Sequence, residues 1–210
     1  MDSTQVVQKG IRIEIFTIVY MACEAILSIV AAVMAHSILL AAFGIDSVLE
    51  LISGGILLWR LQVEARGTET DVGRVERAEQ RAARGTALVL FLLCLYVLVS
   101  ALYGLSNHSQ AESSPLGIGV SLAAVIVMPI LAVQKRRIAK NLNSEAMEED
   151  AVASITCAYM AGTVLVGLLL NALFGWWWVE DVAALVFLFW LGREAWEAFE
   201  GARGKFFINE

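Results

Sequence analysis

Three carboxylates lie inside long apolar stretches of the sequence. Asp46 and Glu50 are four residues apart, and Glu24 lies near the middle of the preceding apolar stretch. An ionisable side chain near the bilayer midplane costs about 2.5–3.5 kcal/mol on insertion scales, so it usually faces a cavity or a partner. Residues four apart on a helix share one face, which allows Asp46 and Glu50 to bind one cation together. Without a cation, their repulsion favours protonation, so the pair predicts a cation site, a proton carrier or both.

A polar stripe surrounds Glu24 on the first apolar stretch. Thr17, Tyr20 and Ser28 recur at helical spacing on the same side as Glu24, so this face is expected to point inward. The alternative is that the buried carboxylates are protonated and hydrogen-bond neighbouring helices together. Three carboxylates at similar depth favour a shared site over this purely structural role.

A second polar face is predicted later in the chain, where Asp150, Ser154 and Cys157 are spaced at i, i+4 and i+7. A buried cysteine is most often a small hydrophobic residue, and an acid in the first turn of a helix is favoured by the helix dipole. This face can contribute to a cation site only if it contacts Asp46 and Glu50. Ser154, Ala158 and Gly162 form a series of small residues that allows close helix approach, so we expect this helix to pack against the helix of the acidic pair.

The elements that must position these residues are long apolar helices. The chain has 210 residues, 59% of them hydrophobic and 17% charged, whereas soluble domains are roughly 45–50% apolar and about 25% charged. At about 20 apolar residues per span, the sequence predicts an all-α, polytopic membrane protein. It forms a single transmembrane domain over residues 1–210, with no separate soluble enzyme domain. The six expected spans cover about residues 12–35, 37–60, 85–106, 116–134, 148–174 and 180–200.

The basic residues predict the orientation in the membrane. All fifteen lie on one side of a six-span arrangement, and the connections near residues 36, 106–115 and 175–181 contain none. Because basic residues are retained in the cytoplasm, both termini are expected there, in a multi-pass protein of the cell membrane. The start of the chain shows no cleavage pattern, so the first span is expected to be retained. The formal net charge of -6 argues against nucleic acid as a partner.

The stretches that contain these polar residues resemble the transmembrane domain of the cation diffusion facilitator family. They read AHSILLAAFGIDSVLELISGGILLWR and EEDAVASITCAYMAGTVLVGLLLNALFGWWW, and the resemblance covers roughly residues 12–200. It implies six helices with cytoplasmic termini, a homodimer, and proton-coupled export of divalent metals such as zinc. It also implies a metal site formed by Asp46 and Glu50 on one helix and by two positions on another, Ala153 and Cys157.

The sequence departs from this family pattern in the second half of the site. Ala153 cannot ligate a metal, and Cys157 replaces an aspartate. The cytoplasmic domain that usually follows the last span in the family is also not expected here. Carboxylates together with a thiolate suit Zn²⁺ or another borderline divalent ion better than Mg²⁺ or Ca²⁺. Asp150, Ser154, Glu24 or water could supply a fourth ligand.

The predicted function is therefore transport of a divalent metal, with protons as the counter-ion, because protons compete with metal for the same ligands. No resident cofactor and no enzyme activity are expected. One alternative is an intramembrane aspartyl protease that uses Asp46 and Asp150 as a catalytic pair. It leaves Glu24 and Glu50 unexplained, and the chain has GID at residues 44–46 rather than a GxGD motif. Another alternative is a metal sensor or a partner subunit that does not transport.

Overall fold

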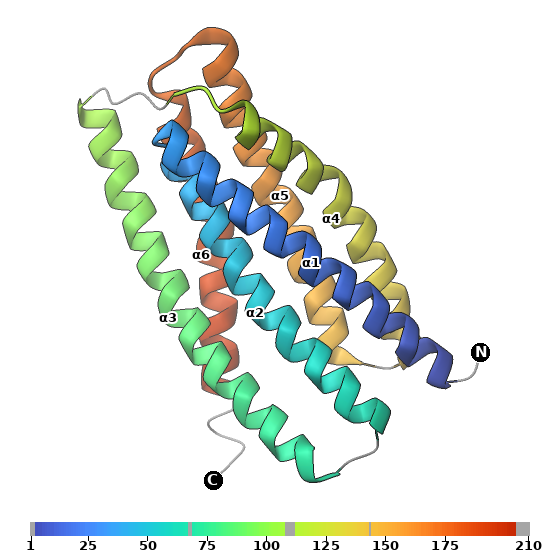
Figure 1. Ribbon diagram of the computed structural model, residues 1–210. Coiled ribbons are helices and arrows are strands. Elements are labelled where there is room, and N and C mark those ends of the chain that lie inside the picture. The colour runs from blue at the N-terminus through green and yellow to red at the C-terminus, as the bar shows by residue number, and fades with distance from the viewer. Residues whose placement is uncertain (1–2, 67–68, 108–111, 143, 205–210) are drawn as a thin grey trace.

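Long helices run the length of the molecule (Figure 1), a computed structural model that describes residues 3–66, 69–107, 112–142 and 144–204. The all-α prediction is confirmed for this part of the chain. Its six helices are α1 (Ser3–Ala35), α2 (Ile38–Arg66), α3 (Glu69–Asn107), α4 (Pro115–Leu142), α5 (Glu145–Phe174) and α6 (Val179–Gly204).

Five of these helices are long and apolar enough to cross a membrane. The segments that qualify are Val6–Ala35, Ile38–Val63, Leu88–Asn107, Pro115–Leu142 and Asp150–Phe174. The sixth predicted span falls on α6, which starts with two acids, Glu180 and Asp181, and contains Arg193 twelve residues later. These charges shorten its apolar stretch, so crossing by α6 remains a prediction.

Particular residues in the connections between helices end one helix or begin the next. α1 ends before His36, which adopts a left-handed backbone with a φ of 52°. Ser37 then caps α2, because its Oγ accepts a hydrogen bond of 3.1 Å from the Leu40 backbone N–H. At α5, the Ser144 side chain caps the start and Gly175, with a φ of 61°, ends the helix.

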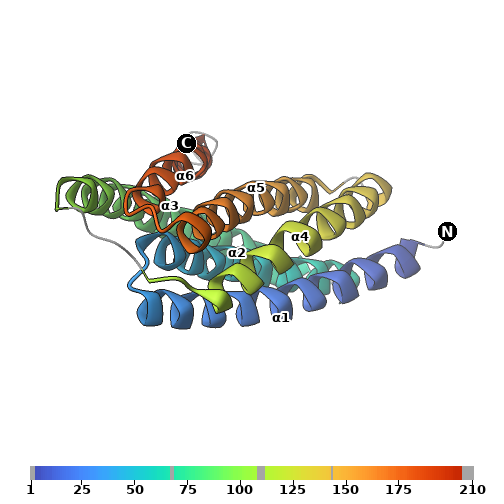
Figure 2. The same cartoon turned by 90° about the horizontal axis from the view of Figure 1, so that it is seen from above.

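α2, the helix that carries the acidic pair, lies at the centre of the bundle (Figure 2). It contacts α1, α3, α5 and α6, while α4 packs chiefly against α5 and α1. A main apolar core takes residues from every helix, including Phe43, Met160 and Phe187. A smaller apolar cluster closes one end of the bundle, and its buried members are Val6, Leu57, Leu61, Ile138, Ala139 and Met147.

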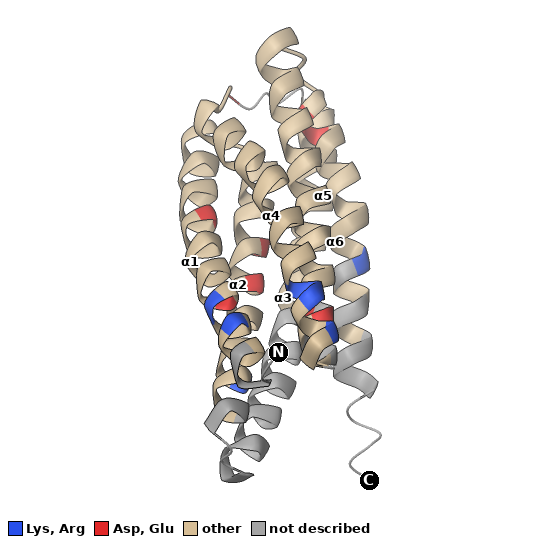
Figure 3. Ribbon diagram, turned by 90° about the vertical axis from the view of Figure 1, so that its right-hand side faces the viewer, with Lys and Arg blue, Asp and Glu red and all other residues tan. Residues whose placement is uncertain are grey.

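The described lysines and arginines gather in the half of the bundle where α1 begins and α4 ends (Figure 3). We call this half the basic end. The smaller apolar cluster lies within it, because its members come from the start of α1 and α5 and from the later parts of α2 and α4. This distribution is what the spacing of basic residues predicts for one face of the membrane.

Candidate metal site

α1 and α2 approach closely beside the acidic pair because Gly44 has no side chain. A Cβ at Gly44 would lie 2.8 Å from Ile29 Cγ1 and 3.1 Å from the Ile29 backbone nitrogen. Both distances are too short for a side chain to fit without moving α1. Ser47 lies three residues later, on the same face of α2, so the close approach at Gly44 also holds Ser47, a neighbour of Asp46, against α1.

The carboxylate of Glu24 connects three helices in the interior. Glu24 is 2% exposed, and its Oε1 accepts a hydrogen bond of 2.9 Å from Ser47 Oγ on α2. The same oxygen lies 3.8 Å from Cys157 Sγ on α5. Its second oxygen, Oε2, has no hydrogen-bond partner among the described residues. Glu24 can therefore offer an oxygen to an ion.

Asp46 and Glu50 lie on α2, one residue before and three residues after Ser47. Both are buried, as is Cys157. Both acids and Glu24 lie close enough to the Cys157 thiol for their charges to act on it. The structure thus brings four of the six predicted site residues into one region between α1, α2 and α5. Within the described ranges, no three Cys, His, Asp or Glu side chains are already grouped as a metal-binding cluster.

Asp150 and Ser154, the other two predicted site residues, bind different partners. Asp150 forms an ion pair with Lys135 of α4. The buried Ser154 donates a hydrogen bond of 3.0 Å from its Oγ to the backbone oxygen of Asp150. Both residues lie on α5, as predicted, but their contacts in this structure are directed away from the Glu24 carboxylate.

Lys135 lies at the centre of a second polar group, nearer the basic end. It is 1% exposed, and its Nζ lies 3.1 Å from Oε2 of the fully buried Glu14 as well as in contact with Asp150. One ammonium group thereby joins α1, α4 and α5, and we call these three residues the lysine bridge. Glu14 rests against Gly54 of α2, where a Cβ would lie 2.8 Å from its Oε1. Gly54 is four residues beyond Glu50, so the lysine bridge lies about one helical turn from the acidic pair.

Glu14 and Lys135 are not among the site residues predicted from the sequence. Glu14 precedes Glu24 by ten residues, close to three helical turns, so the period of the polar stripe could have identified it. Lys135 had no such signal, because it is the first of three consecutive basic residues. The inward orientation of the stripe is confirmed, since Thr17, Glu24 and Ser28 are all buried.

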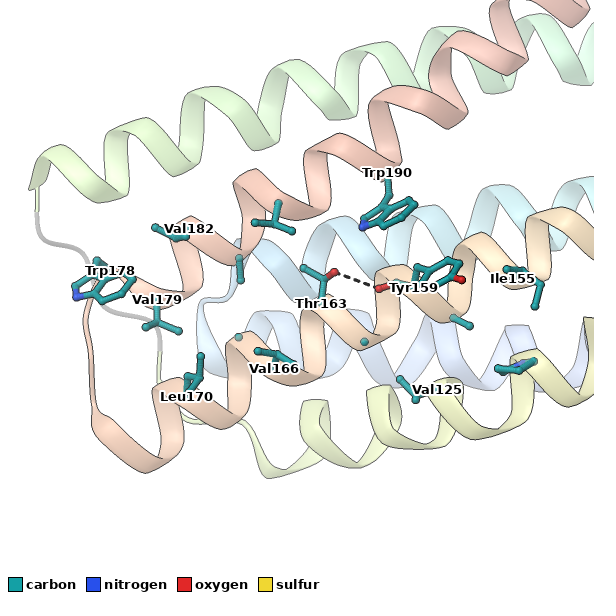
Figure 4. Close-up of a pocket in the computed structure, with 16 residues that line it drawn as sticks. Val125, Ile155, Tyr159, Thr163, Val166, Leu170, Trp178, Val179, Val182 and Trp190 are labelled. Carbon is teal, nitrogen blue, oxygen red and sulfur yellow. Dashed lines mark hydrogen bonds between the residues drawn. The ribbon is translucent and has the colours of Figure 1, made fainter.

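The small residues Ser154, Ala158 and Gly162 of α5 were expected to pack against α2, and the structure places two of them elsewhere. α2 does contact α5, but Ala158 and Gly162 line an apolar groove of about 770 Å³ between α4, α5 and α6 (Figure 4). In this groove, the rings of Tyr159 and Trp190 stack with their centroids 5.0 Å apart. The expectation was therefore wrong for Ala158 and Gly162, because they line the groove with residues of α4 and α6 and not of α2, and a Cβ at Gly162 would lie 4.0 Å from Val125 of α4.

Together, the fold and the buried acids define the class of this molecule: a polytopic α-helical membrane protein with carboxylates gathered inside its bundle. The chain belongs to the cation efflux family, because the family model described as the cation efflux transmembrane domain matches residues 15–202. The resemblance seen in the sequence is thus confirmed. So is the prediction that the chain is not an enzyme, which removes the protease alternative. The ion pair between Asp150 and Lys135 agrees with this conclusion, because the protease alternative needs Asp150 as a partner of Asp46.

Similar proteins include cation efflux proteins of bacteria. The chain is 28% identical over 93 residues to the cation-efflux pump FieF of Shewanella oneidensis, covering 44% of this chain and 31% of that protein. It is 23% identical over 183 residues to the manganese efflux system protein MneS of Bacillus subtilis, covering 86% and 62%. It is 20% identical over 204 residues to the uncharacterized transporter YdbO of the same organism, covering 96% and 70%. The match to FieF therefore spans only about a third of that protein.

Proposed function

We propose that this chain exports a divalent metal ion across the cell membrane in exchange for protons. In this proposal it has six spans, both termini in the cytoplasm, and a homodimeric assembly. The observation that carries the proposal is the Glu24 carboxylate, which connects Cys157 of α5 with Ser47 of α2 beside the acidic pair. Membership of the cation efflux family supports it, as do two relatives whose names describe efflux.

The donor set explains why protons would be exchanged for metal. Carboxylates and a thiolate suit Zn²⁺ and similar borderline ions. Each group binds an ion only in its deprotonated form, so protons and metal compete for the same oxygen and sulfur atoms. Binding would draw Glu24, Asp46, Glu50 and Cys157 onto one ion, which requires small movements of α1 and α5 relative to α2.

In the same proposal, the lysine bridge closes the route between the site and the basic end. Lys135→Gln is expected to increase labelling of Cys157 by a membrane-impermeant thiol reagent added at the basic end. Cys23 and Cys94 would be replaced by serine in all samples. The matched control is Lys140→Gln, an exposed lysine on the same helix. Equal labelling of Cys157 in both variants would place the route elsewhere.

The transport test uses purified protein in proteoliposomes, with a metal-sensitive and a pH-sensitive dye inside. Asp46→Asn and Glu50→Gln are each expected to abolish metal-driven proton movement, because these nearly isosteric amides supply no negative charge. Glu148→Gln, at an exposed acid on α5, should transport like the wild type. Wild-type rates in both site variants would refute the assignment. Metal binding by wild-type protein without any transport would instead indicate a sensor or partner subunit.

A further inference from the structure

A recess lined by basic residues lies at the basic end, between the start of α1 and the end of α4. It has a volume of about 400 Å³. The residues that line it are Val6, Lys9, Gln134, Arg137, Ile138 and Asn141. It is separate from the metal site and from the lysine bridge, neither of which shares a residue with it.

The side chains at the mouth of the recess can all donate hydrogen bonds. Lys9, Gln134, Arg137 and Asn141 are exposed. No carboxylate of the described residues forms an ion pair with Lys9 or Arg137, whereas the adjacent Arg136 lies 3.9 Å from Glu148. In a chain with a net charge of -6, one recess is thus lined by two amides and by two cations that have no counter-ion among the described side chains. This combination fits an anion.

The floor of the recess is apolar and lies at the ends of two apolar spans. Val6 and Ile138 are 6% and 3% exposed and belong to the smaller apolar cluster. The apolar spans of α1 and α4 begin at Val6 and end at Leu142, respectively. The recess therefore lies where two apolar spans end beside exposed polar residues, which is the depth of lipid headgroups.

We propose that this recess binds the phosphate headgroup of an anionic phospholipid. Arg137 and Lys9 contact the phosphate oxygens, and the amides of Gln134 and Asn141 bind the remaining polar part of the headgroup. One acyl chain then runs along Val6 and Ile138. Free phosphate has the same charged oxygens as the headgroup but no apolar part that could contact the floor. The apolar floor therefore favours a lipid. The bound lipid connects α1 to α4, the two helices that the contact between Glu14 and Lys135 also joins.

The test measures lipid binding to the full-length protein by native mass spectrometry in mild detergent. The protein is titrated with phosphatidylglycerol and, separately, with zwitterionic phosphatidylcholine. We expect one phosphatidylglycerol to bind preferentially. The double variant Lys9→Gln with Arg137→Gln should weaken its binding by about 30-fold, from the usual contribution of each cation near a membrane surface. The matched control, Arg136→Gln with Lys140→Gln, removes the same charge from the same end and should bind like the wild type.

Four outcomes would overturn the proposal. Equal losses in the recess variant and the control variant would show attraction to overall charge rather than a site. Complete displacement of phosphatidylglycerol by excess inorganic phosphate would identify free phosphate as the ligand. Equal binding of both lipids by the wild type would show that the headgroup charge is not recognised. The double variant Lys9→Arg with Arg137→Lys keeps both charges. If it loses binding as the glutamine variant does, the two charges are not what binds the headgroup.

Discussion

Removing the ammonium of Lys135 should be one of the most destabilising single substitutions in this bundle. Lys135→Met keeps much of the side-chain length but leaves Glu14 and Asp150 without their shared cation. Glu14 is fully buried and Asp150 is only 18% exposed, so water can replace little of the lost interaction. Removing one partner of a buried ion pair costs more than the pair itself contributes, because the remaining charge stays buried.

The magnitude follows from the geometry of the pair. Opposite unit charges 3.1 Å apart, as between Lys135 Nζ and Glu14 Oε2, attract by about 5 kcal/mol at an effective dielectric constant of 20. Measured losses for broken buried pairs are about 3–5 kcal/mol, which agrees. For a chain of this size, that range corresponds to a fall in Tm of about 6–20 °C.

The assay is thermal unfolding in detergent, followed by the fluorescence of the six tryptophans. The triple variant Glu14→Gln, Lys135→Met and Asp150→Asn removes every charge of the lysine bridge, so it should recover much of the lost Tm. Lys140→Met, at an exposed position on the same helix, should change stability by about 0.5 kcal/mol at most. Unfolding of Lys135→Met at the same temperature as Lys140→Met would refute a stabilising role of the lysine bridge. A triple variant no more stable than Lys135→Met would refute it as well.

Two further predictions concern the site itself. Gly44→Ala should lower stability by about 1–3 kcal/mol in thermal unfolding and slow transport, because the new methyl group collides with Ile29. Gly55→Ala, where a Cβ would meet nothing within 4 Å, should do neither, and equal effects of the two variants would contradict this role for Gly44. In isothermal titration, Cys157→Ser should reduce affinity for Cd²⁺ and Zn²⁺ more than for Mn²⁺, because a hydroxyl does not replace a thiolate for softer ions. Cys23→Ser, at an exposed cysteine, is the control, and an unchanged selectivity order in Cys157→Ser would remove Cys157 from the site.

Helical periodicity explains which features could be predicted from the sequence. The inward face of α1 was identifiable because Thr17, Glu24 and Ser28 repeat with the period of a helix inside an apolar stretch, and all three are buried. The five apolar spans followed from length and composition in the same way. These are properties of single segments, so no knowledge of their neighbours was needed.

Contacts between segments could not be predicted in this way. Asp150 has the correct spacing to join Cys157, but Lys135 from the neighbouring helix pairs with it instead. Lys135 itself looked like one of many cytoplasmic basic residues, and only the packing of α4 against α1 and α5 places it in the interior. Burial of a charged residue depends on which partners the tertiary structure provides, and sequence spacing does not contain that information.

The metal site and the lysine bridge share two helices, α1 and α5, so movement at one of them affects the other. α1 contributes Glu24 to the site and Glu14 to the bridge, ten residues apart, or about 15 Å along the helix. α5 contributes Cys157 and Asp150, seven residues apart, or about 10 Å. Because a helix moves largely as a rigid body over such lengths, a tilt that brings Glu24 or Cys157 onto an ion must also displace a carboxylate that contacts Lys135. In the proposed transport cycle, metal binding and closure of the basic end are therefore mechanically coupled.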